Sequence, residues 1–153
     1  MFNCALTGEQ QFSLVNLYLA NHDQLSQGSS IFTSKANVSV EDAVPTLGVP
    51  SNLFFTSLKS LIEGAVSEYS VILRLNCEGV EDDVIYAAHK VFKDKLKLTM
   101  GSLKDVRGCK GDAAYDALEE YLNINKIPFV FFSSSVHSWR EAHHSINKLI
   151  KSI

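Results

Sequence analysis

The second half of the chain alternates short apolar runs with amphipathic segments. Runs at 70–75, 96–100 and 127–132 are rich in β-branched, aliphatic and aromatic residues, which predicts strands. The last run is apolar at consecutive positions, so we expect a central strand covered on both faces. Segments that begin near Val80, Asp112 and Ser138 repeat apolar residues at helical spacing, which predicts a helix after each strand.

This order of elements predicts the fold class. Strands that alternate with helices imply right-handed crossovers and a largely parallel sheet. We therefore expect α/β architecture: one three-layer α/β/α domain spanning residues 1–153, in which the strands around Val71, Leu98 and Phe129 are adjacent and central.

The first half of the chain has a less regular pattern. Residues 1–6 could form a strand, and 9–21 read as a helix with Phe12, Val15 and Leu19 facing inward. The stretch from 24 to 50 is polar at first and then carries two prolines, which predicts an irregular connection around a short strand at 30–33. Apolar residues spaced as on a helix then precede the strand at 70–75: Leu58, Leu61, Ile62 and Ala65.

The amino-acid composition limits the classes of protein to which the chain can belong. The chain has 153 residues, of which 46% are hydrophobic and 20% charged, as in a globular domain and unlike a disordered chain. No apolar run approaches the ~20 residues that span a bilayer, and the first residues do not resemble a secretory signal. Three widely spaced cysteines without a C-x-x-C motif argue against a disulfide framework and a zinc site. A cytoplasmic, reducing location and no direct membrane insertion are expected.

Half of the positive charge lies in one segment. Residues 90–110 hold seven basic and two acidic side chains, so this segment has a charge of +5 while the remainder of the chain has −8. A concentration of cations in an acidic protein indicates a place that meets an anion. The alternative interpretation is the solvated surface of an ordinary helix end.

The segment also crosses a glycine-containing stretch, 100–112, which we expect to be a loop between a strand and a helix. Loops at the carboxyl ends of strands bind ligands in open α/β sheets, and glycine lets backbone amides approach a phosphate. Serines at the end of the next strand would lie beside this loop, although capping of the following helix is an alternative role for them. The candidate RNA- or anion-binding residues are Lys90, Lys93, Lys95, Lys97, Gly101, Lys104, Arg107, Gly108, Lys110, Gly111, Ser133 and Ser134.

No catalytic motif accompanies these residues. The glycine spacing matches neither a P-loop nor a dinucleotide fingerprint, and no G-x-S-x-G surrounds a serine. A single H-x-S sequence occurs, at 143–145, whereas a two-histidine phosphoesterase needs two. We therefore expect neither an enzyme nor a bound cofactor or metal.

Residues 70–150 resemble the distal half of a viral macrodomain. The likeness follows the strand at 71–75, the segment Leu-Thr-Met-Gly-Ser-Leu at 98–103 and Ile-Pro-Phe-Val-Phe-Phe-Ser-Ser-Ser at 127–135. It is similar to the macrodomain-like modules of coronavirus non-structural protein 3, especially the middle module of the SARS-unique domain. The resemblance implies a mixed sheet between helix layers, within a multidomain replication protein of the host-cell cytoplasm, at membrane-associated replication sites.

The resemblance implies either ADP-ribose binding or RNA binding with partner docking. The chain lacks the Asn-Ala-Ala-Asn and Gly-Gly-Gly segments of the ADP-ribose-binding class, so RNA, single-stranded or structured, is the better inference. Docking to other domains of the same polyprotein or to host proteins remains an alternative. The run at 127–133 also resembles a strand of bacterial receiver domains, but an acceptor aspartate does not follow the earlier strands.

Overall fold

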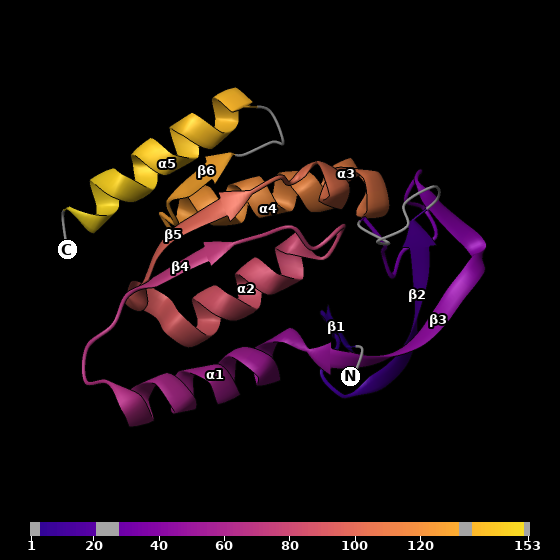
Figure 1. Cartoon of the computed structure of the whole chain (residues 1–153), viewed down its shortest axis with the longest axis horizontal. Coiled ribbons are helices and arrows are strands. Elements are labelled where there is room, and N and C mark those ends of the chain that lie inside the picture. Colours follow the sequence, from indigo (N-terminus) through magenta and orange to yellow (C-terminus); the bar gives the residue numbers. More distant parts are fainter. Residues whose placement is uncertain (1–3, 21–27, 132–135, 152–153) are drawn as a thin grey trace.

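The computed structural model describes residues 4–20, 28–131 and 136–151, which form two small sheets and a set of helices (Figure 1). In chain order the elements are β1 (Cys4–Thr7), β2 (Ser13–Ala20), β3 (Val38–Pro50), α1 (Ser51–Ala65), β4 (Val71–Arg74), α2 (Glu81–Phe92), the 3-10 turn η1 (Lys93–Lys95), β5 (Leu96–Gly101), α3 (Lys104–Lys110), α4 (Asp112–Ile124), β6 (Phe129–Phe131) and α5 (Val136–Ile150). The α/β class expected from the sequence is confirmed. No helix in the described part of the chain has the length and apolar character needed to cross a bilayer.

The second half folds as the strand–helix alternation predicts. Strands β4, β5 and β6 pair in that order and run parallel. When successive strands are added in one direction, right-handed crossovers place the connecting helices on the same face of the sheet. In agreement with this rule, α2 contacts both α3 and α4. Helix α5 contacts β5 and β6 (Figure 1). Because Leu98, Thr99 and Met100 are consecutive and all buried, β5 is covered on both faces and is the central strand.

Strand β6 is not the central strand that its apolar sequence predicts. It has three residues, pairs with β5 alone, and leaves Phe131 51% exposed at the edge of the sheet. Ile127 is buried, but it lies before the strand. The apolar run is therefore divided between a loop that packs on the core and a short edge strand, so consecutive apolar residues did not indicate a doubly covered strand here.

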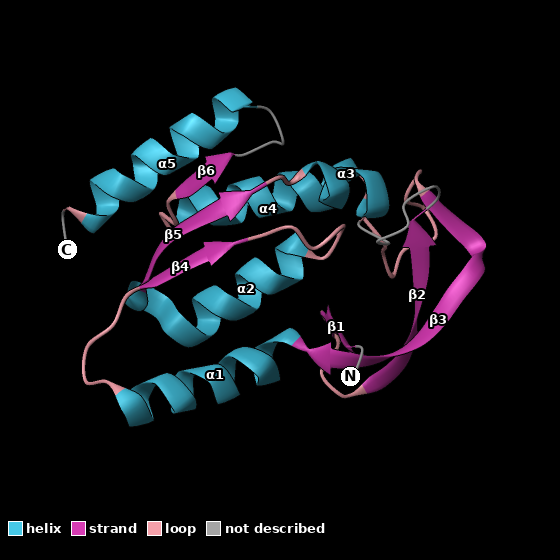
Figure 2. Ribbon diagram, in the orientation of Figure 1, coloured by secondary structure: helices cyan, strands magenta, loops and turns pink. Residues whose placement is uncertain are grey.

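The first half forms a separate sheet, which the sequence did not predict. β3 is its middle strand, parallel to β1 and antiparallel to β2 (Figure 2). The helix expected at 9–21 is wrong, since residues 13–20 are β2. The irregular connection expected up to Pro50 is also wrong beyond residue 37, because residues 38–50 form β3, and Pro45 lies within this strand. Among the described residues, β1 pairs with residues 47–50 of β3 and β2 pairs with Pro45, so Pro45 has one described neighbouring strand, a position where a missing N–H is tolerated.

The two sheets join through helices rather than through strand pairing. β3 leads directly into α1, and α1 packs along α2, while both helices contact β1. The single mixed sheet that the resemblance implies is therefore divided: the mixed sheet is β1–β3–β2, and the sheet covered by helices is wholly parallel.

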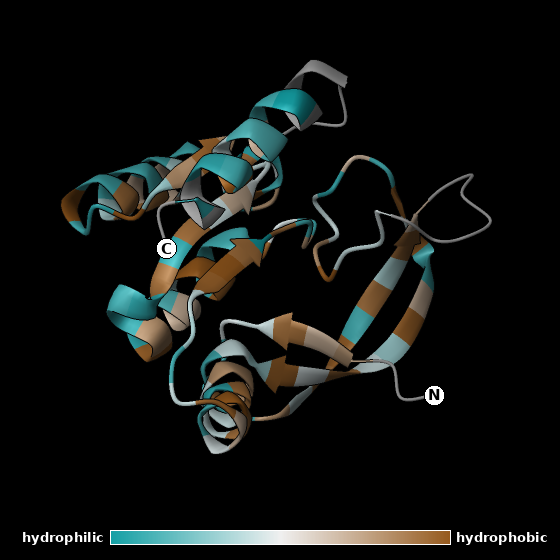
Figure 3. Cartoon of the chain, turned by 60° about the vertical axis from the view of Figure 1, so that its left-hand side comes forward, coloured by the Kyte–Doolittle hydropathy of each residue, from teal (hydrophilic) through white to brown (hydrophobic). Residues whose placement is uncertain are grey.

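The main core lies between β4–β5 and the α1, α2 and α4 helices. Its most buried residues are Ile85 and Ala88 of α2, Val106 of the helix 104–110 and Leu118 of α4, each 0% exposed. The Phe55 ring of α1 meets Phe92 edge-on with centroids 5.8 Å apart, which fastens α1 to the core. Figure 3 shows apolar and polar residues alternating along β2 and β3, as expected for strands with one exposed face.

Candidate basic surface

The stretch expected to be a glycine loop is mostly helix. Residues 104–110 form α3, whose Val106 is 0% exposed, so only a short link separates it from β5. Gly101 belongs to β5 and is packed against the backbone of Leu75, while Gly108 lies within α3. Gly111, with φ +89°, joins α3 to α4. The loop prediction is therefore wrong, because burial of Val106 favours a helical turn over an open loop.

Two cations of α3 are engaged by carboxylates. Lys110 reaches Asp82 at 2.6 Å and Asp83 at 2.7 Å, both at the start of α2. Burial disfavours the charged lysine, but these two hydrogen bonds outweigh it and raise the pKa of Lys110. Arg107 pairs with Asp112 at 3.0 Å and lies 3.9 Å from the centre of the Tyr115 ring.

A segment from the first half covers the carboxyl end of β5. The Phe32 ring and the Cys109 thiol both lie against Gly79, and the Lys35 ammonium pairs with Glu78 and, at 3.5 Å, with Asp105. Side chains of this chain therefore lie beside the loops that follow β4 and β5, the place where an open α/β sheet binds ligands.

Lys93, Lys95 and Lys97 lie at the opposite, amino end of the sheet, whereas Lys104 begins α3 at the carboxyl end and has no ion pair among the described residues. Residues 93–95 form η1, directly before β5, and Lys97 is the second residue of β5. The strand between them and α3 is six residues long, about 20 Å. The structure therefore does not bring the cations of the basic segment together at one place: some lie around η1, some on α3, and Lys90 lies on α2.

Two neighbouring cavities flank η1. One, of about 400 Å³, contains Lys93, Lys97 and Lys126 with His89 and Asp94. The other, of about 450 Å³, contains Lys59, Glu63, Tyr69 and again Lys93 and Asp94, together with Lys95. The five lysines that line them exceed the two carboxylates, Glu63 and Asp94. We call this surface the basic end, with the lysines Lys59, Lys93, Lys95, Lys97 and Lys126.

Contacts at the basic end leave most of its cations unpaired. Lys59 is bound to Glu63 at 2.8 Å. Within the described residues, no ion pair joins Lys93, Lys97 or Lys126 to a carboxylate. Lys93 and Lys126 both have positive φ, 50° and 53°, because each follows the end of a helix where the chain turns toward the next strand.

The carboxyl ends of helices also lie at the basic end. Helix α5 runs back along the sheet, so its last turn, followed by exposed Lys151, lies at the same end of the molecule as the start of β5 (Figure 1). Exposed Lys148 belongs to that part of α5. Lysines stabilise the partial negative charge of helix carboxyl ends, which gives them a structural role beside any ligand role.

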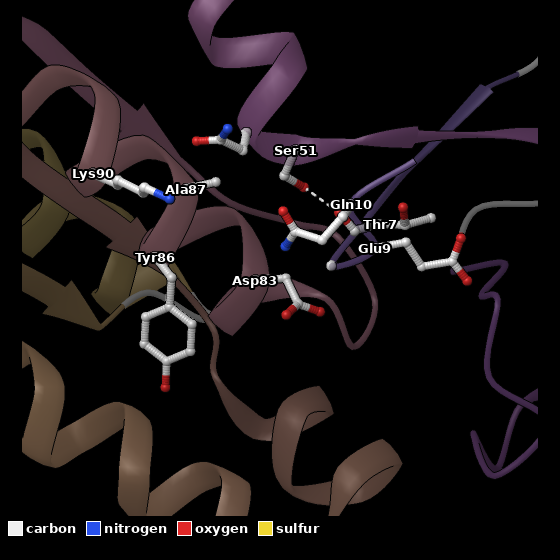
Figure 4. Close-up of a pocket in the computed structure, with 10 residues that line it drawn as sticks. Thr7, Glu9, Gln10, Ser51, Asp83, Tyr86, Ala87 and Lys90 are labelled. Carbon is white, nitrogen blue, oxygen red and sulfur yellow. Dashed lines mark hydrogen bonds between the residues drawn. The ribbon is translucent and has the colours of Figure 1, made fainter. Parts of the chain in front are cut away.

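Lys90 lies apart from the other lysines. It lines a third cavity, of about 240 Å³, where the parallel strands β1 and β3 end (Figure 4). Figure 4 shows Lys90 and Asp83 projecting from α2, with Gln10 on the facing wall. The Ser51 hydroxyl donates to the carbonyl of Thr7 at 2.9 Å. Because Glu9 and Asp83 also line this cavity, it is not a basic site.

Sequence reasoning missed Lys59, Lys126 and Tyr69. They lie outside the basic segment, and only the packing of α1 and α4 against α2 brings them beside η1. Ser133 and Ser134 fall outside the described residues. Among the residues the structure describes, no group of His, Cys, Asp or Glu side chains could hold a metal ion.

Comparison of the chain with protein-family models, with curated proteins and with solved structures found no match. The fold and the basic end therefore carry the functional argument.

Proposed function

We propose that this chain is a non-enzymatic, macrodomain-like module that binds RNA through the basic end. The observation that carries the proposal is the contrast between the two ends of β5. At the carboxyl end, Lys110 and Arg107 are paired with Asp82, Asp83 and Asp112, and Lys104 has no carboxylate partner among the described residues. At the amino end, Lys93, Lys97 and Lys126 lie together without a carboxylate partner among the described residues. Unpaired lysines are the ones that release counterions when they meet phosphates.

The shape of the basic end supports a chain-like anion over a small ligand. Its two cavities share Lys93 and Asp94, so they form one continuous surface around η1. Lysines spread along such a surface can contact successive phosphates of one strand. A small phosphate ligand is better served by a closed pocket with convergent donors.

The protonation state of two cysteines supports a function without catalysis. Burial raises the pKa of the Cys77 and Cys109 thiols, which keeps both protonated and poorly nucleophilic. The resemblance to the modules of coronavirus non-structural protein 3 supports placing the RNA-binding activity within a larger viral replication protein, beside other domains or host proteins.

A titration with labelled single-stranded and hairpin RNA at two salt concentrations tests the proposal. Because about three to five phosphates would be neutralised, the log–log salt slope should be roughly −2 to −4. The triple variant Lys93→Gln, Lys97→Gln, Lys126→Gln should bind RNA at least about tenfold more weakly at low salt. The magnitude of its log–log salt slope should be smaller than that of the parent by roughly 2.

The matched control removes the same charge elsewhere: Lys104→Gln, Arg107→Gln, Arg140→Gln, all at exposed positions. Its affinity should stay within about threefold of the parent, apart from long-range screening effects. Thermal unfolding of both variants separates lost binding from lost helix stability. No binding at low salt, or equal loss in the two variants, would refute the proposal and favour the protein-docking alternative.

A further inference from the structure

The groove on the α1 side of η1 contains an aromatic side chain among its lysines. Tyr69, just before β4, lines this cavity of about 450 Å³ together with Lys59, Lys93 and Lys95. The volume exceeds that needed for one nucleobase. No aromatic residue lies between Lys93 and Lys110 in the sequence, so this neighbour comes from tertiary packing alone.

The Tyr69 ring is fixed in place by two contacts. Its hydroxyl donates to Glu63 at 3.0 Å, and Glu63 is also bound by Lys59. Desolvation and this hydrogen bond raise the pKa of Tyr69, so the hydroxyl stays protonated and the contact persists at neutral pH. The Tyr69 and Phe92 rings meet in a T-shaped arrangement, with centroids 6.4 Å apart and an interplanar angle of 82°. A ring held in this way loses little entropy when a ligand stacks on it.

The Lys95 ammonium lies 5.8 Å from the centre of the Tyr69 ring, a loose cation–π contact. Lys95 and Lys93 both line the groove, Lys95 with its ammonium over the Tyr69 ring and Lys93 at the border shared with the second cavity. This arrangement combines a π-face with adjacent cations, which is the combination that binds single-stranded nucleic acid.

We infer that Tyr69 stacks on an unpaired nucleobase while Lys93 and Lys95 contact its flanking phosphates, so the basic end selects single-stranded RNA over duplex. The inference rests on the proposed function, because it assigns a substrate class to the same surface. A paired base has both faces covered by its neighbours and cannot enter the groove. Stacking also predicts tolerance of base identity, since every base presents a π-face.

The test compares Tyr69→Leu with Tyr69→Phe, using a single-stranded RNA, an abasic strand of the same length and an RNA duplex. Tyr69→Leu should weaken single-stranded RNA binding about tenfold with the salt slope unchanged, while Tyr69→Phe stays within about threefold of the parent. The abasic strand and the duplex should bind the parent more weakly than single-stranded RNA, and Tyr69→Leu should not weaken them further. Thermal unfolding of both variants shows whether the fold is retained.

Two failures remain distinguishable. If single-stranded RNA binds the parent and Tyr69→Leu equally well, or if the abasic strand binds as tightly as RNA, stacking is overturned while RNA binding stands. If no oligonucleotide binds the parent at low salt, the proposed function is overturned and the inference with it.

Discussion

The roles of several single residues in this protein depend on contacts that the surrounding sequence does not reveal. The acidic triplet at the start of α2 divides into two roles. Glu81 is 1% exposed and accepts hydrogen bonds from the backbone N–H groups of Cys77 and Gly79, both at 2.9 Å. Asp82 and Asp83 instead hold Lys110. Favourable interaction with the helix dipole is thus the smaller part of what these carboxylates do.

Glu81 should make stability depend on pH in a definite direction. Burial raises the pKa of Glu81 above its ordinary value of 4.5, so the native state holds its proton more tightly than the unfolded state. Its contribution is therefore greatest at low pH and declines as pH rises through 4.5 toward the raised value. Urea unfolding of the parent and Glu81→Gln should show the parent's relative stability falling as pH rises above 4.5. A difference that is constant, or grows with pH, would contradict this assignment.

Two glycines that the sequence assigned to one loop should respond oppositely to alanine. At Gly101 an added Cβ would lie 2.8 Å from the carbonyl oxygen of Leu75, so Gly101→Ala should cost about 1–3 kcal/mol of unfolding free energy. At Gly108, inside α3, no atom lies within 4 Å of the new Cβ, so Gly108→Ala should add about 0.5–1 kcal/mol. Urea unfolding measures both, and near-neutral effects at both positions would instead fit an open glycine loop.

At the scale of elements, the spacing of apolar residues alone does not distinguish a helix from a strand at β2. Phe12, Val15 and Leu19 have helical spacing, yet Val15 and Leu17 also alternate with Leu14 and Asn16 as in a strand. Pairing with β3 decides the outcome, with Leu14 opposite Leu47 on the exposed face. Helices α2 and α4 of the second half were predicted correctly because their inward stripes are longer and match the 3.6-residue period.

The inward stripe of α4 supplies an element-scale prediction. Leu118 is 0% exposed between α4 and the core, so Leu118→Ala should lower the free energy of unfolding by about 2–5 kcal/mol. Leu61, on the outer face of α1, is 73% exposed, and Leu61→Ala should change it by less than about 0.5 kcal/mol. Chemical denaturation of both variants checks the pair. Equal losses would show that α1 buries its outer face in solution.

At the scale of the whole molecule, charge is arranged by end. Lys35, Arg107 and Lys110 are paired with carboxylates near the carboxyl end of the parallel sheet, and a cluster of lysines without ion pairs among the described residues lies at its amino end. This arrangement moves the candidate site from the place where open α/β sheets bind ligands to the opposite end of the same sheet.

The carboxyl end of the parallel sheet adds a reason to expect no ADP-ribose binding. The asparagine and glycine segments of the binding class are missing, and the Phe32 ring and the Cys109 thiol lie against Gly79 in the loop after β4. Calorimetric titration with ADP-ribose should give no heat of binding at micromolar protein concentration, with single-stranded RNA as the positive control. Micromolar affinity for ADP-ribose would assign the chain to the active macrodomain class instead.

The sequence by itself determined the elements whose information is local. Helices α1, α2 and α4 and strands β4 and β5 each carry a period or an apolar run within their own residues, so neighbours along the chain specify them. It also identified Lys93, Lys95 and Lys97, now part of the basic end, and the excess of positive charge around them.

Only the tertiary structure decided what depends on distant partners. Strands β2 and β3 exist because they pair with each other across a long connection, and β6 is an edge strand because no further strand lies beside it in the described chain. The availability of each cation was decided in the same way: Lys110 meets carboxylates 27 and 28 residues away, whereas Lys93 meets none in the described residues. Coulomb attraction acts through space and not along the sequence, so a charge count cannot distinguish a paired lysine from a free one.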